Sequence, residues 1–146
     1  MFDGRIRPLN VLLVEDNPGD VRLMREALRN GEAAKKLDAV EDGEEALAYL
    51  HRRHPYTAAP KPDLIFLDLN LPKKDGREVL LEIKQDESLR RIPVVVLTTS
   101  EAERDISRVY ELHANCYVKK PTDLDEYMEV IRACENFWLH VVRLPR

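Results

Sequence analysis

The chain has 146 residues, enough for one domain with its own core and no need of disulfides or structural metals. Its 27 acidic and 23 basic residues give a formal charge of −4 without a long run of one sign, which excludes a general nucleic-acid-binding surface. Two cysteines, no signal-peptide segment and no apolar window near the roughly 20 residues of a membrane span argue against secretion and membrane insertion and favour the cytoplasm.

Five short apolar runs have the composition of strands in a parallel sheet that is covered on both faces. The third run, Leu64–Leu67, is uninterrupted, whereas the second is poor in apolar residues and fits an edge position. The fourth run is rich in β-branched residues and starts with Pro93. The runs lie at residues 11–14, 36–40, 64–67, 93–98 and 116–118.

Amphipathic segments predict a helix after each strand. In the first helix, Asn17 fits the N-cap, Pro18 the first helical position and Asn30-Gly31 the end. Ser100 is expected to cap the fourth helix, and the proline-rich segment 54–62 is expected to be a surface loop. The helices are expected to begin at Pro18, after Asp42-Gly43, after Gly76, at Glu101 and near Asp123, the last one running through Trp138.

This alternation of strands and helices predicts an α/β fold, in which helices cover both faces of a parallel sheet. The sequence shows no internal repeat, no low-complexity tract and no interdomain linker, so residues 1–146 are expected to form a single domain. Its core is expected at about residues 9–132, with a helix extension and tail at about 133–146.

Polar side chains stand where four of the predicted strands end. Glu15 and Asp16 follow the first strand, Asp68 the third and Lys120 the fifth, and Thr98 ends the fourth. The carboxyl ends of the strands are the edge of an open α/β sheet where ligands bind. Crowded carboxylates repel one another unless a cation holds them ionised, and Mg²⁺ prefers such oxygen ligands. With a lysine and a hydroxyl to hold phosphoryl oxygens, the set is sufficient for phosphorylation of an aspartate.

Four motifs resemble those of receiver domains, the phospho-accepting half of two-component signalling. They are Val14-Glu-Asp-Asn17, Leu67-Asp-Leu-Asn-Leu-Pro72, Leu97-Thr-Thr-Ser100 and Val118-Lys-Lys-Pro121. The resemblance covers roughly residues 10–132 and implies a flavodoxin-like (βα)5 fold with strand order 2-1-3-4-5. Leu97-Thr-Thr-Ser100, Lys120-Pro-Thr-Asp-Leu124 and Phe137-Trp-Leu139 further resemble the stand-alone receivers that partner phytochrome histidine kinases.

The resemblance implies a role for each matching residue. Asp68 is expected to take the phosphoryl group from a sensor histidine kinase, here of the phytochrome type, with Mg²⁺ as cofactor and Mn²⁺ or Ca²⁺ as substitutes. No enzymatic activity is expected beyond self-phosphorylation from small phosphodonors and autodephosphorylation. The other expectations are metal binding by Glu15, Asp16, Asp68 and Asn70, phosphoryl binding or switching by Thr98, Thr99, Lys120 and Tyr117, and a cis peptide bond before Pro121.

Two other functions remain open. A pseudo-receiver is an interaction module that never takes phosphate, but such domains lose one of the acid, aspartate or lysine positions, and this chain has them all. An aspartyl-nucleophile phosphatase would need a second aspartate two residues after the nucleophile, where Asn70 stands, and a cap domain. Neither G-x-G-x-x-G nor a P-loop is present, so flavin or nucleotide binding is not expected.

The C-terminal segment carries more apolar residues than one helix can bury. A stripe at helical spacing, ending at Trp138 and Val141, is expected to dock the last helix on the sheet. A second apolar row indicates a homodimer interface, the alternative being a tail folded over the domain's own sheet edge. The interface residues expected are Phe137, Trp138, Leu139 and Val142.

The segment after Lys120-Pro121, about 25 residues, is too short for a helix-turn-helix output domain. Signalling is therefore expected through contact with a downstream protein that the sequence does not identify, without nucleic-acid or membrane partners.

Overall fold

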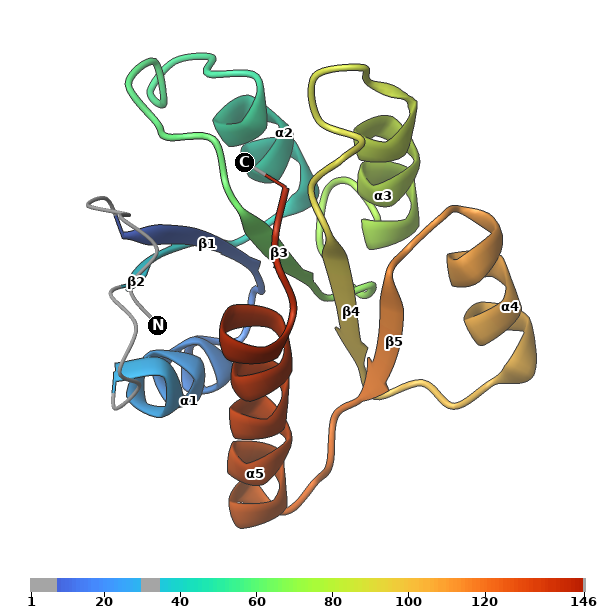
Figure 1. Ribbon diagram of the computed structural model, residues 1–146. Coiled ribbons are helices and arrows are strands. Elements are labelled where there is room, and N and C mark those ends of the chain that lie inside the picture. Colours follow the sequence, from blue (N-terminus) through green and yellow to red (C-terminus); the bar gives the residue numbers. More distant parts are fainter. Residues whose placement is uncertain (1–7, 30–34, 146) are drawn as a thin grey trace.

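A computed structural model describes residues 8–29 and 35–145. It has a five-stranded sheet in the order β2-β1-β3-β4-β5, with every pair of neighbouring strands parallel, which confirms the predicted fold (Figure 1). The weak second strand lies at an edge, as predicted. The elements are β1 (Leu9–Val14), α1 (Pro18–Arg29), β2 (Lys35–Val40), α2 (Gly43–Leu50), β3 (Leu64–Leu67), α3 (Gly76–Gln85), β4 (Val94–Thr98), α4 (Glu103–Glu111), β5 (Cys116–Lys119), α5 (Leu124–Glu135) and a π-helix, η1 (Asn136–Val141).

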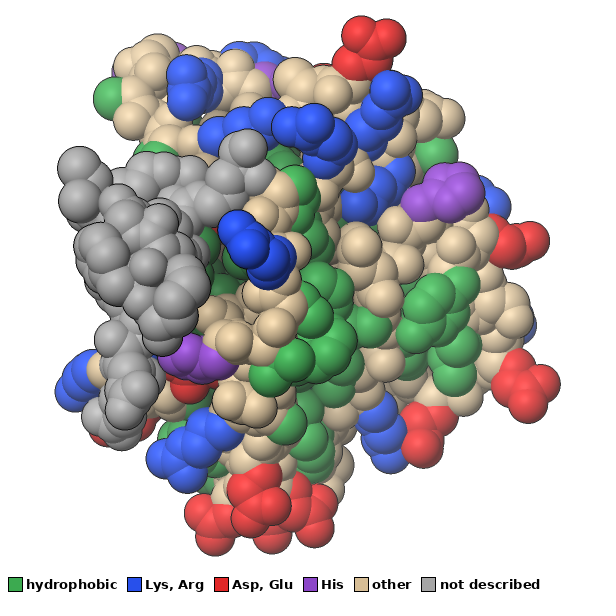
Figure 2. All heavy atoms as spheres, viewed as in Figure 1, with side chains coloured by type: hydrophobic (Ala, Val, Ile, Leu, Met, Phe, Trp, Pro, Cys, Tyr) green, Lys and Arg blue, Asp and Glu red, His purple; other side chains and the backbone are tan. Residues whose placement is uncertain are grey.

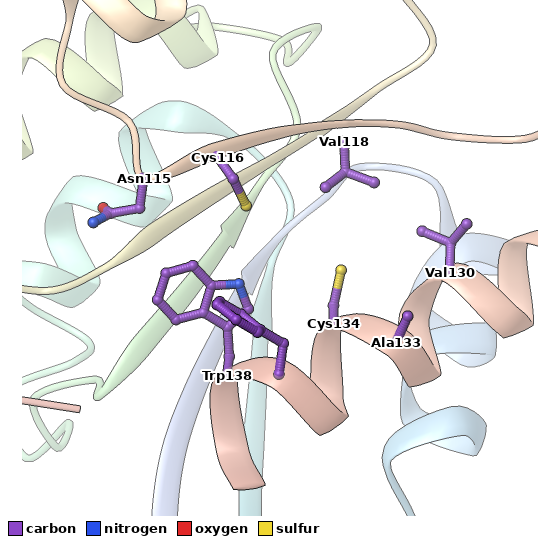
Figure 3. Close-up of a pocket in the computed structure, with 8 residues that line it drawn as sticks. Asn115, Cys116, Val118, Val130, Ala133, Cys134 and Trp138 are labelled. Atoms are coloured by element: carbon purple, nitrogen blue, oxygen red, sulfur yellow. The ribbon is translucent and has the colours of Figure 1, made fainter. Parts of the chain in front are cut away.

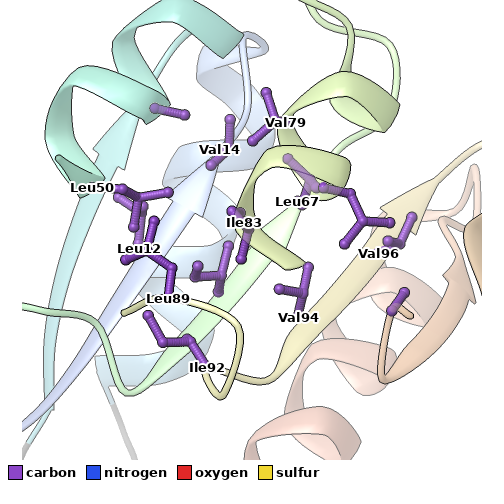
Figure 4. Packing of buried hydrophobic residues seen from close by; sticks show 14 of the residues in the cluster. Leu12, Val14, Leu50, Leu67, Val79, Ile83, Leu89, Ile92, Val94 and Val96 are labelled. Carbon is purple, nitrogen blue, oxygen red and sulfur yellow. The ribbon is translucent and has the colours of Figure 1, made fainter. Parts of the chain in front are cut away.

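Side chains that alternate along the central strands build two separate cores. Leu12 and Val14 of β1 pack on one face with residues of α2, α3 and α4 (Figure 4). Leu13 of β1 and Phe66 of β3 pack on the other face with α1 and α5. Because the central strands are covered on both sides, their sequences are apolar throughout rather than alternating with polar residues.

Side-chain caps start four of the five α-helices that follow the strands, α1, α2, α3 and α5. The Oδ1 atom of Asn17 accepts hydrogen bonds from the N–H groups of Gly19 (2.8 Å) and Asp20 (3.1 Å), as predicted for α1. Asp42, Asp75 and Asp123 cap α2, α3 and α5 in the same way. The predicted end of α1 at Asn30-Gly31 lies outside the described residues. These caps fix where the helices begin, next to the carboxyl ends of the strands.

The fourth helix starts differently from the prediction. It begins at Glu103, with Ala102 at the N-cap position and no side-chain capping bond, so the prediction that Ser100 caps it is wrong. The hydroxyl of Ser100 instead donates to Oδ2 of Asp105 (2.6 Å), a residue within the first turn. Arg77 of α3 donates to the other oxygen of the same carboxylate (2.9 Å). The side chain of Asp105 therefore connects the start of α4 to α3.

The last helix widens into a π-helix after Glu135, and this changes which residues face the sheet. The buried positions are Tyr127, Ile131, Glu135 and Leu139, spaced four apart. The predicted α-helical stripe is therefore wrong at its end, because the wider turn leaves Val141 62% exposed. Leu139 is 7% exposed and belongs to the core beneath α1 and α5, so its assignment to a dimer interface is also wrong.

A buried ion pair joins the edge strand to the last helix. The ammonium of Lys35 in β2 lies 2.6 Å from Oε2 of Glu135, and both side chains are less than a tenth exposed. The attraction between these two buried charges holds the end of α5 on the same face of the sheet that α1 covers.

The proline-rich segment 54–62 lies outside the helices and strands, as predicted. Within the described residues the structure has a cis peptide bond at His54–Pro55 and a trans bond at Lys120–Pro121, so the predicted cis bond before Pro121 is wrong. The two isomers of a prolyl bond differ by only about 0.5–1 kcal/mol, too little for a sequence motif to fix one of them. No helix in residues 8–29 and 35–145 has the length and apolar composition needed to cross a bilayer.

Candidate functional site at the carboxyl ends of the strands

Three carboxylates meet where β1 and β3 end side by side. Val14 pairs with Leu67 in the sheet, and the N–H of Asp68 donates to the carbonyl of Val14 (3.0 Å). This register brings the residues that follow each strand together. One carboxylate oxygen from each of Glu15, Asp16 and Asp68 lies within 4.8 Å of the others. Glu15 and Asp68 are buried and Asp16 is exposed, so the cluster opens to solvent on one side.

Lys120 lies over this cluster from the far end of the sheet. Its N–H donates to the carbonyl of Thr98 (2.7 Å), which continues the pairing of β4 with β5 beyond the strands. The ammonium donates to Glu15, and it lies 3.1 Å from Oδ2 of Asp68 and 3.0 Å from Oδ2 of Asp20. The side chain is 7% exposed, so these ion pairs are screened little by water.

Burial changes the protonation of the groups in contact. It raises the pKa of Glu15 from 4.5 to about 7, since the lost hydration outweighs the hydrogen bond from Lys120 and the charge of Asp68 acts in the same direction as burial. Burial alone would lower the pKa of Lys120, but the hydrogen bond to Glu15 and the charge of Asp68 outweigh it and raise that pKa. The ammonium therefore stays charged and compensates part of the carboxylate charge.

The cluster has the chemistry of a site for a hard divalent cation. Three carboxylates provide oxygen ligands, and one side is open for the waters and phosphate oxygens that Mg²⁺ keeps in its shell. Asn70 lies next to the cluster, where its N–H donates to Oδ1 of Asp68 (3.2 Å). Ligation by Asn70 stays a prediction.

The predicted switch residues are connected to the site through the loop after β4. Thr98 is fully buried, and its hydroxyl oxygen accepts from the N–H of Ser100 (3.4 Å). Tyr117 is half-buried, and its hydroxyl donates to the carbonyl of Ser100 (2.6 Å). Thr99 is exposed at the surface of this loop. A shift of Thr98 would therefore reach Tyr117 through Ser100.

Asp20 was not predicted from the sequence. It lies in the first turn of α1, outside the four motifs, and contacts the ammonium of Lys120. Its four-residue separation from Asp16 in the printed sequence was the available signal, because the start of a helix turns back toward the strand end that precedes it.

A groove of about 640 Å³ lies between β5 and the last helices, away from the carboxylates (Figure 3). Its lining is almost wholly apolar. Phe137 and Trp138 stack edge to face beside it, with ring centroids 5.3 Å apart, and Phe137 is 47% exposed. Figure 2 shows hydrophobic side chains at the surface over α5. The lining residues are Asn115, Cys116, Val118, Val130, Ala133, Cys134, Phe137 and Trp138.

Comparison with known proteins gives consistent matches. The family model for the response regulator receiver domain matches residues 11–132. The chain is 49% identical over 145 residues to response regulator Rcp1 of Synechocystis sp., covering 99% of each chain, and 40% identical to the probable methanogenesis regulatory protein FilR2 of Methanothrix harundinacea, covering 94% of this chain and 88% of that one.

Two solved structures are similar over nearly the whole chain. The Mn²⁺-bound form of Rcp1 has a TM-score of 0.93 and 50% identity, covering 95% of this chain and 100% of that chain. The phosphorylated cyanobacterial phytochrome response regulator RcpA has a TM-score of 0.93 and 51% identity, covering 96% and 100%.

Proposed function

The chain belongs to the response regulator receiver domain family, and from this premise we propose that it is a signalling switch that accepts a phosphoryl group on Asp68 from a sensor histidine kinase. The observation that carries the proposal is the contact of Lys120 with Asp68 inside a cluster of three carboxylates. A structural aspartate at a strand end would not need both an ammonium and two further acids around it.

In the proposed reaction an oxygen of Asp68 attacks the phosphorus of a phosphohistidine. The new O–P bond forms as the P–N bond breaks, and the electron pair of that bond returns to the imidazole of the kinase. A divalent cation held by Glu15, Asp16 and Asp68, when bound, neutralises charge on the phosphoryl oxygens. Lys120 would neutralise further charge from the other side, since its ammonium already lies 3.1 Å from Asp68.

The response is proposed to spread through the loop after β4. The hydroxyl of Thr98 would turn to a phosphoryl oxygen and give up its contact with the N–H of Ser100. Because Tyr117 is bonded to the carbonyl of Ser100, this would change the position of the tyrosine at the outer edge of the sheet. Thr99 is proposed as a second hydroxyl that could bind the phosphoryl group. Apart from transfer of the phosphoryl group to and from Asp68, no enzymatic activity is proposed.

The partners follow from the similarity to known regulators. RcpA is a cyanobacterial phytochrome response regulator, so a phytochrome-type histidine kinase is the proposed phosphodonor, in the cytoplasm. The proposed cofactor is Mg²⁺, and the manganese in the structure of Rcp1 supports a divalent cation. Output is proposed to pass to a downstream protein by direct contact.

A homodimer is the proposed assembly. The apolar groove between β5 and the last helices, with Phe137 47% exposed at its side, supports it, because such a surface is usually covered by a partner. Trp138 and Val142 are half-buried and adjoin this surface, whereas Leu139 contributes to the chain's own core.

The phosphorylation proposal is tested with acetyl phosphate and Mg²⁺, followed by intact-mass measurement. The wild type is expected to gain one phosphoryl group, and Asp68→Asn none, because the nucleophilic oxygen is gone. Asp125→Asn, which changes an exposed acid in the first turn of α5, is the matched control and should react as the wild type does. Equal labelling of Asp68→Asn, or labelling of the wild type in excess EDTA, would contradict the proposal; no labelling of any variant would favour the pseudo-receiver.

A further inference from the structure

Among the residues that the structure describes, the ammonium group of Lys120 has three carboxylate partners, and only two of these belong to the proposed cation site. Glu15 and Asp68 are members of the cluster, whereas Asp20 is not. The distance from the ammonium to Oδ2 of Asp20 is 3.0 Å, as short as that to Asp68. An ammonium has three N–H donors, so in this structure all three are used.

Helix α1 holds Asp20 in this position. Asp20 is the third residue of the helix, and its N–H donates to the capping side chain of Asn17 (3.1 Å). An acid in the first turn is also favoured by the helix dipole. Its carboxylate is therefore placed by a capped helix end rather than by the cation ligands.

In the proposed chemistry, cation binding and phosphorylation would both take partners away from Lys120. Glu15 and Asp68 would hold a divalent cation with their oxygens, and its charge would repel the nearby ammonium. When Asp68 becomes an acyl phosphate, its side-chain carboxyl group loses the negative charge that attracts Lys120. Of the three partners, Asp20 alone has no other role in the proposed chemistry.

We propose that Asp20 is a positioning residue that keeps the ammonium of Lys120 beside Asp68 while a divalent cation occupies the carboxylate cluster. The inference rests on the proposed function and deepens it. With one N–H held by Asp20, the other two can turn to phosphoryl oxygens. Asp20 also compensates the charge of Lys120, so the lysine competes less with the cation for Glu15 and Asp68.

The test is Mg²⁺ affinity measured by calorimetry, together with NMR of the Lys120 ammonium protons in the cation-bound protein. Asp20→Asn is expected to weaken Mg²⁺ binding about three- to tenfold, because an uncompensated Lys120 retains the two shared carboxylates. In this variant the ammonium protons of Lys120 should exchange with water faster than in the wild type. Asp20→Glu, which keeps a carboxylate near the ammonium, should bind Mg²⁺ within about twofold of the wild type. Asp125→Asn is the control for a first-turn acid that does not contact Lys120.

A double-mutant cycle separates the positioning role from the simple loss of a nearby negative charge. In a Lys120→Gln background, Asp20→Asn should weaken Mg²⁺ binding by a smaller factor than in the wild type. An equal factor in the two backgrounds, or unchanged affinity and ammonium exchange in Asp20→Asn, would overturn the inference and leave the proposed function intact. Failure of the wild type to bind Mg²⁺ would instead contradict the proposed function itself. Circular dichroism of each variant confirms that it is folded, and Asp20→Ser, which also removes the carboxylate, carries the test if Asp20→Asn does not fold.

Discussion

At the scale of single residues, Glu15 is the carboxylate of the site whose ionisation burial opposes and Lys120 favours. Its side chain is 2% exposed, and it lies between the ammonium of Lys120 and a second carboxylate, Asp68. The pKa of about 7 means that, without a cation, the folded protein binds a proton at Glu15 more tightly than the unfolded chain does. Ionised Glu15 therefore costs the folded protein stability when no cation is bound.

This conflict predicts a pH dependence of stability in the cation-free protein. The contribution of Glu15 is fully present below the unfolded pKa of 4.5 and is lost as the pH rises through about 7. Between pH 5 and 8 the free energy of unfolding should therefore fall by on the order of 2 kcal/mol more in the wild type than in Glu15→Gln. Urea denaturation in the presence of EDTA, at a series of pH values, measures the free energy of unfolding of the two proteins. Parallel pH profiles for the two proteins would show that Glu15 does not titrate in this range.

The residues at the strand ends could be predicted from the sequence because parallel pairing leaves little freedom there. Once Val14 lies beside Leu67, Glu15 and Asp68 must be neighbours. Asp20 could not be predicted in the same way, since its contact with Lys120 depends on the direction that the first turn of α1 takes and not on strand register. The isomer of the bond before Pro121 depends on a small energy difference that no local pattern determines.

At the scale of elements, the start of α3 packs directly on the segment that carries Asp68. The N–H of Gly76 donates to the carbonyl of Leu69 (2.9 Å). A Cβ atom at Gly76 would lie 2.4 Å from the carbonyl oxygen of Asp68 and 2.6 Å from Cα of Leu69, both backbone atoms. This close approach requires glycine.

Gly76→Ala is accordingly expected to destabilise the fold by about 2 kcal/mol or more, since the backbone around Asp68 must move. Gly19→Ala is the matched control, because a Cβ there would meet only the side chain of Asn17, at 3.1 Å. That variant should stay within about 1 kcal/mol of the wild type. Chemical denaturation of both proteins measures the difference, and similar losses in the two would show that the clash at Gly76 is relieved cheaply.

Helix starts that are capped by aspartate or asparagine could be predicted from the sequence. The start of α4 and the π-helix after Glu135 could not. Helix α4 has few buried residues, so contacts from Arg77 and Ser100 to Asp105 decide where it begins. In the π-helix after Glu135, Leu139 is buried and Val141 is exposed. An α-helical period therefore assigned Val141 to the core in place of Leu139.

At the scale of the whole molecule, the proposed phosphorylation site and the apolar groove lie in different places on one sheet. The site is at the carboxyl ends of β1, β3 and β4, and the groove lies along β5 and α5. Tyr117 belongs to β5 and contacts the loop after β4. A change at the site therefore has a short route to the surface proposed for dimerisation.

Phe137→Ser should weaken that dimer by roughly tenfold or more, because exposed aromatic residues carry much of the binding energy of interfaces. Leu81→Ser, at a side chain 37% exposed on α3, is the control and should leave the dimer unchanged. Sedimentation equilibrium at micromolar concentration measures both. A monomeric wild type would exclude the dimer, and an unaffected dimer in Phe137→Ser would place its interface elsewhere.

The two cores also differ in when a ribosome can complete them. Residues for the face covered by α2, α3 and α4 have all been synthesised once Ala114 has been added. The opposite face also needs Tyr127, Ile131 and Leu139, and Glu135 for the ion pair with Lys35, and these four residues are all synthesised after Ala114. On the nascent chain the part of that face covered by α5 therefore stays open for longer than the first core, and its apolar side chains are where we would expect a chaperone to bind during translation.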